Sequence, residues 1–259
     1  MTDTSDAIGP EIAKAAPDLL AEKAESPWPR MAALALLAGA FISFGSIAFL
    51  IAQSVPGGPT GPVQLLSGVA FSVGLLMVMV AGAELFTGNT MFVLPVARGR
   101  LSAGRMAGAW ALVWFGNLLA SLGIAWLFFA AGGTDAMDGA VGEAARRVAG
   151  DKLAKGAGAV FASAILANML VCLGVWMSME ARTVTAKAVA VVAPVAVFVA
   201  AGFEHSIANM SLLPIGLLAG APGELSAVLL NLVVSTLGNI VGGAAIALAL
   251  AYGHSGGDS

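Results

Sequence analysis

Charged side chains are scarce in this chain. Of its 259 residues, only 10% are Asp, Glu, Lys or Arg, whereas 59% are hydrophobic. Soluble domains carry about 25% charged residues, so this chain has too few to cover a globule with polar surface. The composition therefore predicts an integral membrane protein. The 12 Lys and Arg residues are also too few for the basic surface of a nucleic-acid-binding domain.

Cysteine and histidine are nearly absent as well. The single cysteine, Cys172, cannot form an intrachain disulfide and lies in an apolar run that is typical of a small buried residue. The two histidines, His205 and His254, are too few for the usual zinc site. We therefore expect no metal and no other cofactor.

Long hydrophobic runs are what the sequence does contain. A membrane-spanning helix needs roughly 20 mainly apolar residues. Six candidate spans meet this requirement, near residues 31–53, 64–95, 106–131, 154–179, 186–215 and 225–252. The second and fifth are too long and too interrupted to be simple rods, so we expect broken helices there. The predicted fold class is an all-α membrane protein with six transmembrane helices.

Lys and Arg are distributed unequally between the connections, and the cytoplasmic side of a membrane protein carries their excess. The N-terminal segment and every second connection hold Lys14, Lys23, Arg30, Arg98, Arg100, Arg105, Arg182 and Lys187. The opposite side holds Arg146, Arg147, Lys152 and Lys155, all in the third-to-fourth loop. This distribution predicts a cytoplasmic N-terminal segment (1–29) and a cytoplasmic tail (253–259), on either side of a single six-helix transmembrane domain (30–252).

Apolar residues in the N-terminal segment, Ile12, Leu19 and Leu20, alternate with Lys and Glu. This pattern predicts a short surface helix. Two roles fit such a helix: an anchor at the membrane interface, or a regulator of a pore from the cytoplasmic side.

The two halves of the chain resemble each other. AGAELFTGNTM (81–91) matches AGFEHSIANM (201–210), LLAGAFISFG (36–45) matches ILANMLVCLG (165–174), and WFGNLLAS (114–121) matches TLGNIVGG (236–243). The repeats cover about 31–131 and 154–252. Because each repeat has three crossings, the second copy must be inverted relative to the first, as in many transporters and pores.

Both predicted breaks carry polar residues, and a broken helix leaves backbone groups that are expensive in hydrocarbon. We expect the side chains of Glu84, Asn89, Glu204 and Asn209 to satisfy those groups. Thr87 and Ser206 could do so at a helix N-terminus. Two roles fit His205, which can donate, accept or carry a proton: it bridges the two breaks, or it faces a permeation path.

The motif GFEHSIANM, together with LFTGNTM, ILANMLVCLGVWMS and TLGNIVGG in the same order, resembles the formate/nitrite transporter family from about residue 30 onward. The resemblance implies an aquaporin-like fold with two broken helices, assembled as a homopentamer with one pore per subunit in a bacterial-type inner membrane. The Asn-Pro-Ala boxes of true aquaporins are absent, since the equivalent positions read Gly88-Asn89-Thr90 and Ala208-Asn209-Met210.

The family's functional residues have counterparts in this sequence. The resemblance implies that His205 is the pore histidine and that Thr87 is its hydrogen-bond partner. It implies a vestibule lysine at Lys152, with Lys155 as the alternative, and a vestibule asparagine at Asn239. The hydrophobic constrictions that it implies are formed by Phe71, Leu75, Leu85 and Phe198.

These residue types suit a channel or proton-coupled facilitator for small monovalent weak-acid anions. Formate is the first choice of substrate, with nitrite second and hydrosulfide or lactate-like acids as further alternatives. A neutral-solute facilitator for water or ammonia is the competing class, and an intramembrane enzyme using Glu204 and His205 is a third. Adjacent residues on a helix do not face each other and no nucleophile accompanies this pair, so we expect no enzymatic activity.

Overall fold

The computed structural model describes residues 8–179 and 181–254, which form helices joined by short connections. The elements are α1 (Ile8–Ala24), α2 (Trp28–Ala52), α3 (Gly61–Ala81), α4 (Phe86–Asn89), η2 (Thr90–Phe92), α5 (Val93–Ala97), α6 (Ala103–Ala130), α7 (Ala140–Leu153), α8 (Ala157–Ser178), α9 (Val184–Ala200), α10 (Ser206–Leu218) and α11 (Leu225–Gly253). Over these residues there is no β-strand, which confirms the predicted all-α class.

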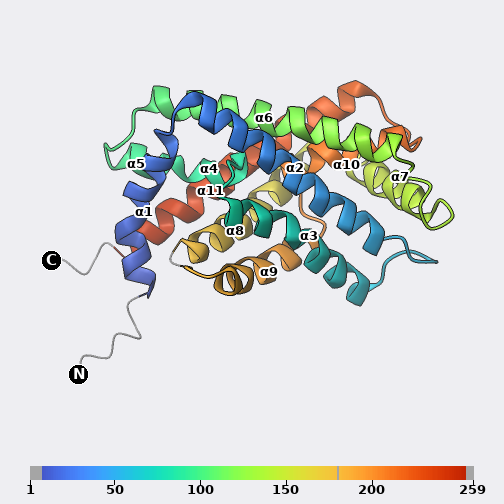
Figure 1. Ribbon diagram of the computed structural model, residues 1–259, viewed down its shortest axis with the longest axis horizontal. Helices are drawn as coiled ribbons and strands as arrows, with labels where there is room; N and C mark the ends of the chain where they lie inside the picture. Colours follow the sequence, from blue (N-terminus) through green and yellow to red (C-terminus); the bar gives the residue numbers. More distant parts are fainter. Residues whose placement is uncertain (1–7, 180, 255–259) are drawn as a thin grey trace.

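Within the part of the chain that the structure describes, five helices are long and apolar enough to cross a membrane: α2, α3, α6, α8 and α11. α2 packs against α3 and α6, and α8 packs in the same way against α9 and α11. Figure 1 shows the long helices running along the long axis of the molecule. In this view α1 and the C-terminal end of α11 lie at one end, and α7 lies at the other.

The two spans predicted to be broken are interrupted in the structure. The span near 64–95 is divided into α3 and the short elements α4, η2 and α5, and the span near 186–215 is divided into α9 and α10. Gly82 (φ 65°) and Gly202 (φ 66°) follow the first helix of each pair in the left-handed conformation, which glycine adopts without strain. Leu85 and His205 are then extended and begin the next helix.

The N-terminal helix α1 forms as predicted, but it packs against the rest of the protein and does not lie only at the surface. Its residues Ile12 and Leu20 are buried, whereas Leu19 is exposed. Helix α1 contacts η2 and α5, immediately after the first break. The Arg105 side chain fixes its end by donating a 2.8 Å hydrogen bond to the carbonyl oxygen of Ala24.

The predicted third-to-fourth loop contains an ordered helix, α7. Its buried face, which includes Val141, Ala145 and Ala149, packs against α10. This helix was not predicted as a separate element because it is short and is apolar along one face only. Its last turns carry Lys152 toward the second break.

Glycines allow close packing of α8 against α11. Substitution of Gly242, on α11, tests the importance of this contact. A Cβ atom at Gly242 would clash with the carbonyl oxygen of Ile165. We expect Gly242→Ala to destabilise the protein by about 1–3 kcal/mol, as overpacking typically does, and to lower the midpoint of thermal unfolding in detergent. Gly123→Ala on α6 is the matched control, since no atom lies within 4 Å of a Cβ at that glycine. Equal midpoints for the two variants would contradict this account of the α8–α11 contact.

Candidate functional site: a cavity beneath the second break

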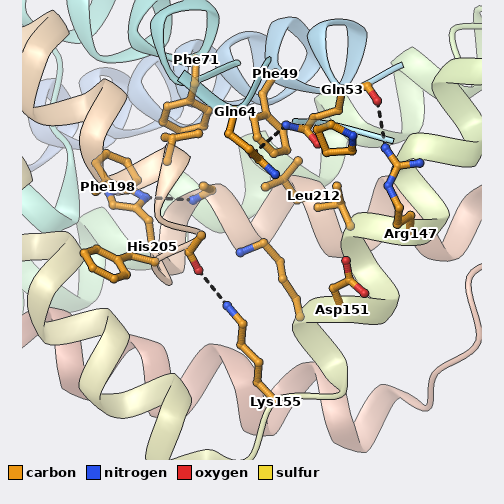
Figure 2. Close-up of a pocket in the computed structure, with 17 residues that line it drawn as sticks. Phe49, Gln53, Gln64, Phe71, Arg147, Asp151, Lys155, Phe198, His205 and Leu212 are labelled. Atoms are coloured by element: carbon orange, nitrogen blue, oxygen red, sulfur yellow. Dashed lines mark hydrogen bonds between the residues drawn. The ribbon is translucent and has the colours of Figure 1, made fainter. Parts of the chain in front are cut away.

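A cavity of about 240 Å³, here called the vestibule cavity, lies between the α7 end of the bundle and the second break. It is lined by Phe49, Gln53, Pro59, Gln64, Phe71, Arg147, Val148, Asp151, Lys152, Lys155, Phe198, Val199, Gly202, Phe203, His205, Ala208 and Leu212. Figure 2 shows Gln53, Gln64, Arg147 and Asp151 on one side of the cavity, and Phe71 and Phe198 with His205 on the other. The cavity therefore passes from a charged rim to an apolar floor.

His205 forms part of that floor and is held by two hydrogen bonds. Its Nδ1 accepts from the backbone N–H of Ala208 at 3.1 Å, so the ring caps the N-terminus of α10. Its Nε2 lies 3.0 Å from Oγ1 of Thr87 in the first break. Because a backbone N–H can only donate, the neutral ring carries its proton on Nε2 and donates it to Thr87. The hydroxyl proton of Thr87 is then available to another acceptor.

Aromatic rings narrow the cavity beside this histidine. The ring of Phe198 stacks on His205 with centroids 5.7 Å apart, and Phe71 meets Phe198 edge to face at 5.9 Å. The structure thus brings Phe71, Phe198, His205 and Thr87 together. Leu75 and Leu85 are both buried but do not line the vestibule cavity.

The backbone groups freed at the breaks are satisfied mainly by two asparagines from other helices. Asn117 donates from Nδ2 to the carbonyl oxygens of Ala35 (2.7 Å) and Glu84 (3.0 Å), and its Oδ1 accepts from the N–H of Phe86 (3.0 Å). These bonds tie α6 to α2 and to both sides of the first break. The role of Asn117 was not predicted, although it lies in a motif that recurs between the two halves.

Asn239 makes the same three bonds at the second break. Its Nδ2 donates to Ala164 (2.8 Å) and Glu204 (3.0 Å), and its Oδ1 accepts from the N–H of Ser206 (2.8 Å). Asn239 is fully buried and does not line the vestibule cavity. The structure therefore corrects the expectation of a vestibule asparagine: Asn239 holds the broken backbone together.

The four residues expected to satisfy that backbone instead pair with one another through their side chains. Asn89 donates to the carboxylate of Glu84 at 2.7 Å, and Asn209 donates to that of Glu204, also at 2.7 Å. Their amide groups are used to hold a buried carboxylate at each break. This pairing corrects the predicted scaffolding role.

Lysines complete both carboxylate sites. Lys23 of α1 lies 3.5 Å from Glu84, while Lys152 and Lys155 lie 3.0 Å and 2.6 Å from Glu204. Both candidates for the vestibule lysine, Lys152 and Lys155, line the cavity. Two ammonium groups facing one carboxylate leave an excess positive charge beside the vestibule cavity.

Asn168 was another residue that the sequence reasoning missed. Its Nδ2 donates to the backbone oxygen of Thr87 (3.1 Å), to Oγ1 of Thr90 (2.9 Å) and to the backbone oxygen of Asn239 (2.6 Å). It therefore fixes the segment that presents Thr87 to His205. Its presence in the ILANM motif was the available signal.

Comparisons with known proteins agree with this geometry. A family model described as Formate/nitrite transporter matches residues 10–253. The formate channel FocA of Escherichia coli strain K12 is 37% identical over 230 residues, which cover 81% of each chain. The nitrite transporter NirC of the same strain is 33% identical over 223 residues, which cover 85% of this chain and 81% of NirC.

Two solved structures are similar over most of the chain. One described as an FNT family ion channel has a TM-score of 0.84 and 30% identity, covering 94% of this chain and 98% of its own. A pentameric formate channel with formate bound has a TM-score of 0.79 and 32% identity, covering 87% and 96%. These matches, with the apolar spanning helices, define the chain as a membrane transport protein. This chain belongs to the formate/nitrite transporter family.

The relatives named above are channels and transporters, which fits the expectation that this protein is not an enzyme. Within the described part of the chain, no group of three or more His, Cys, Asp or Glu side chains could hold a metal ion. The site therefore combines three features: a charged rim, an aromatic floor and the Thr87–His205 pair.

Proposed function

We propose that this protein is a channel or proton-coupled facilitator for small monovalent weak-acid anions, with formate as the principal substrate. The observation that carries the proposal is the Thr87–His205 hydrogen bond beneath a cavity with excess positive charge. Similarity to formate channels and to a transporter of nitrite supports this substrate class. Nitrite and hydrosulfide are the alternatives within the same class.

The proposed architecture has six crossings arranged as two inverted repeats of three. Helices α3 with α4–α5, and α9 with α10, each form one broken crossing, while α2, α6, α8 and α11 form the others. The equivalent bonds of Asn117 and Asn239 support this pairing of the halves. The unequal distribution of Lys and Arg supports cytoplasmic termini in an inner membrane. In this proposed orientation the vestibule cavity is on the periplasmic side. The similarity to a pentameric formate channel supports a homopentamer.

In the proposed mechanism, the lysine pair raises the local anion concentration in the vestibule cavity. Entry into the apolar floor as an ion is opposed by an idealised Born cost of order 20 kcal/mol. A weak-acid anion can avoid this cost by taking up a proton from the water of the vestibule cavity. The Thr87 hydroxyl polarises the substrate by donating a hydrogen bond to it, while His205 donates to the threonine oxygen, and both side chains keep their own protons. The neutral acid then passes Phe71 and Phe198, continues past Leu75 and Leu85, and ionises on the far side.

Purified protein in liposomes tests this function directly. An inward formate gradient is expected to change the lumenal pH much faster than in protein-free liposomes, as formate and a proton cross together. Nitrite and hydrosulfide are expected to compete for this flux. If anions do not compete and only water or ammonia crosses, the protein is a neutral-solute facilitator and the proposal is wrong.

A further inference from the structure

A second, smaller cavity lies on the other side of the lysine pair. This lateral cavity has a volume of about 60 Å³, which is roughly two water-sized volumes. It lies where the end of α7 meets the first turns of α8 and α11, and it is lined by Lys152, Leu153, Lys155, Ala157, Val160, Ala227, Leu230, Asn231 and Val234. Lys152 and Lys155 therefore separate it from the vestibule cavity, which they also line.

Asn231, which lines this cavity, has a buried donor that makes no hydrogen bond within the described residues. Its side chain is 5% exposed, and its Nδ2 has no hydrogen-bond partner among the described residues. The orientation of the amide follows from its neighbours, because Asn209 must direct its own Nδ2 to the carboxylate of Glu204 (2.7 Å). The same Nδ2 donates to Oδ1 of Asn231 at 2.8 Å. Oδ1 of Asn231 is thereby fixed as the acceptor, and Nδ2 is left as the free donor.

The lysine pair beside the cavity carries more positive charge than the neighbouring carboxylate balances. Lys152 and Lys155 together carry two positive charges, and Glu204, fully buried between them, supplies one negative charge. No carboxylate lines the lateral cavity, whose other wall residues are apolar. Water screens part of this charge, since the Lys152 side chain is 13% exposed and that of Lys155 is 32% exposed. The buried amide donor of Asn231 has no such contact with water, and leaving it without a partner is costly. A water molecule could accept from Asn231 but would not compensate the charge.

We propose that the lateral cavity is a second anion-binding site, which holds one small monovalent anion against Asn231 Nδ2 and the ammonium groups of Lys152 and Lys155. The site lies outside the proposed permeation path, so anion binding there does not depend on transport. An anion in the lateral cavity balances the lysine pair while the vestibule cavity is empty. It thereby reduces the attraction that the pair exerts on an anion in the vestibule.

Bromide is the probe for this site, because its anomalous X-ray scattering identifies its position. Crystals of the full-length protein grown in bromide are expected to show an anomalous peak in the lateral cavity, within hydrogen-bond distance of Asn231 Nδ2. Absence of this peak at saturating bromide would overturn the proposal. If the lateral site does not exist, formate flux in liposomes is still expected. Failure of this proposal is therefore distinguishable from failure of the proposed transport function.

Asn231→Asp is the informative variant. The substitution is isosteric, keeps the oxygen that accepts from Asn209, and supplies the missing negative charge. We expect the variant to fold, to lose the lateral bromide peak and to lose any bromide-dependent rise in its thermal unfolding midpoint that the unmodified protein shows. A peak that persists in Asn231→Asp would show that Asn231 does not hold the ion. A variant that is less stable at every bromide concentration, with an unchanged bromide response, would assign Asn231 a structural role only.

Discussion

His205→Ala is expected to lower formate flux about ten- to a hundredfold and to abolish the dependence of that flux on pH. The substitution removes the Nε2–H donor to Thr87 and with it the polarised hydroxyl at the cavity floor. A hydrogen bond that involves a charged group contributes about 1.5–3 kcal/mol, and each 1.4 kcal/mol corresponds to a factor of ten in rate. Liposome flux at a series of external pH values measures both quantities.

Two further variants separate the explanations for such a loss. His254→Ala changes the only other histidine, which is exposed near the end of α11, and is expected to leave flux unchanged. His205→Asn keeps a hydrogen-bonding side chain but cannot carry a proton, so flux that recovers without pH dependence would assign proton transfer to the imidazole itself. The role proposed for the Thr87–His205 pair is wrong if His205→Ala alters neither the flux nor its response to pH.

Asn239→Leu is expected to destabilise the protein by about 2–5 kcal/mol. The leucine removes three buried hydrogen bonds at the second break. Each buried group that loses its hydrogen-bond partner costs about 1–3 kcal/mol. The cost is smaller where the group finds a new hydrogen-bond partner within the membrane. A lower thermal unfolding midpoint in detergent, with loss of the assembled state at a lower temperature, is the expected observation.

The two halves of the protein provide controls for this prediction. Asn117→Leu removes the equivalent three bonds at the first break and is expected to have a similar cost. Thr236→Val, also on α11, removes only the bond from Trp114 Nε1 (3.1 Å) and is expected to cost much less. If Asn239→Leu were no more damaging than Thr236→Val, the breaks would not depend on these asparagines.

Much of the architecture could be predicted from hydrophobicity and from the similarity between the two halves. The apolar runs place α2, α6, α8 and α11, and Gly82 and Gly202 lie in the predicted interruptions. These features are local in the sequence: a run of apolar residues needs lipid or protein around it, and a left-handed turn favours glycine. Helix α7 was missed because a short helix with one apolar face resembles a loop in an otherwise hydrophobic chain.

The candidate site was predicted less completely, because its polar partners come from separate helices. The sequence identified Thr87 and His205 through family resemblance, and the structure brings them within hydrogen-bond distance. The pattern could not show that Asn117 and Asn239, rather than the glutamates, satisfy the broken backbone. Nor could it show that both Lys152 and Lys155 reach one carboxylate. Such assignments depend on the angle at which helices distant in sequence cross.

The positions of Asn117 and Asn239 in the chain determine when each break can close during synthesis. The first break receives Asn117 as soon as α6 emerges, so the N-terminal half can close while the rest is still being made. The second break has no such partner until α11, the last helix, has been synthesised. Nascent chains arrested before α11 should therefore stay vulnerable to membrane proteases at residues 201–206, while the segment around residue 84 is already protected.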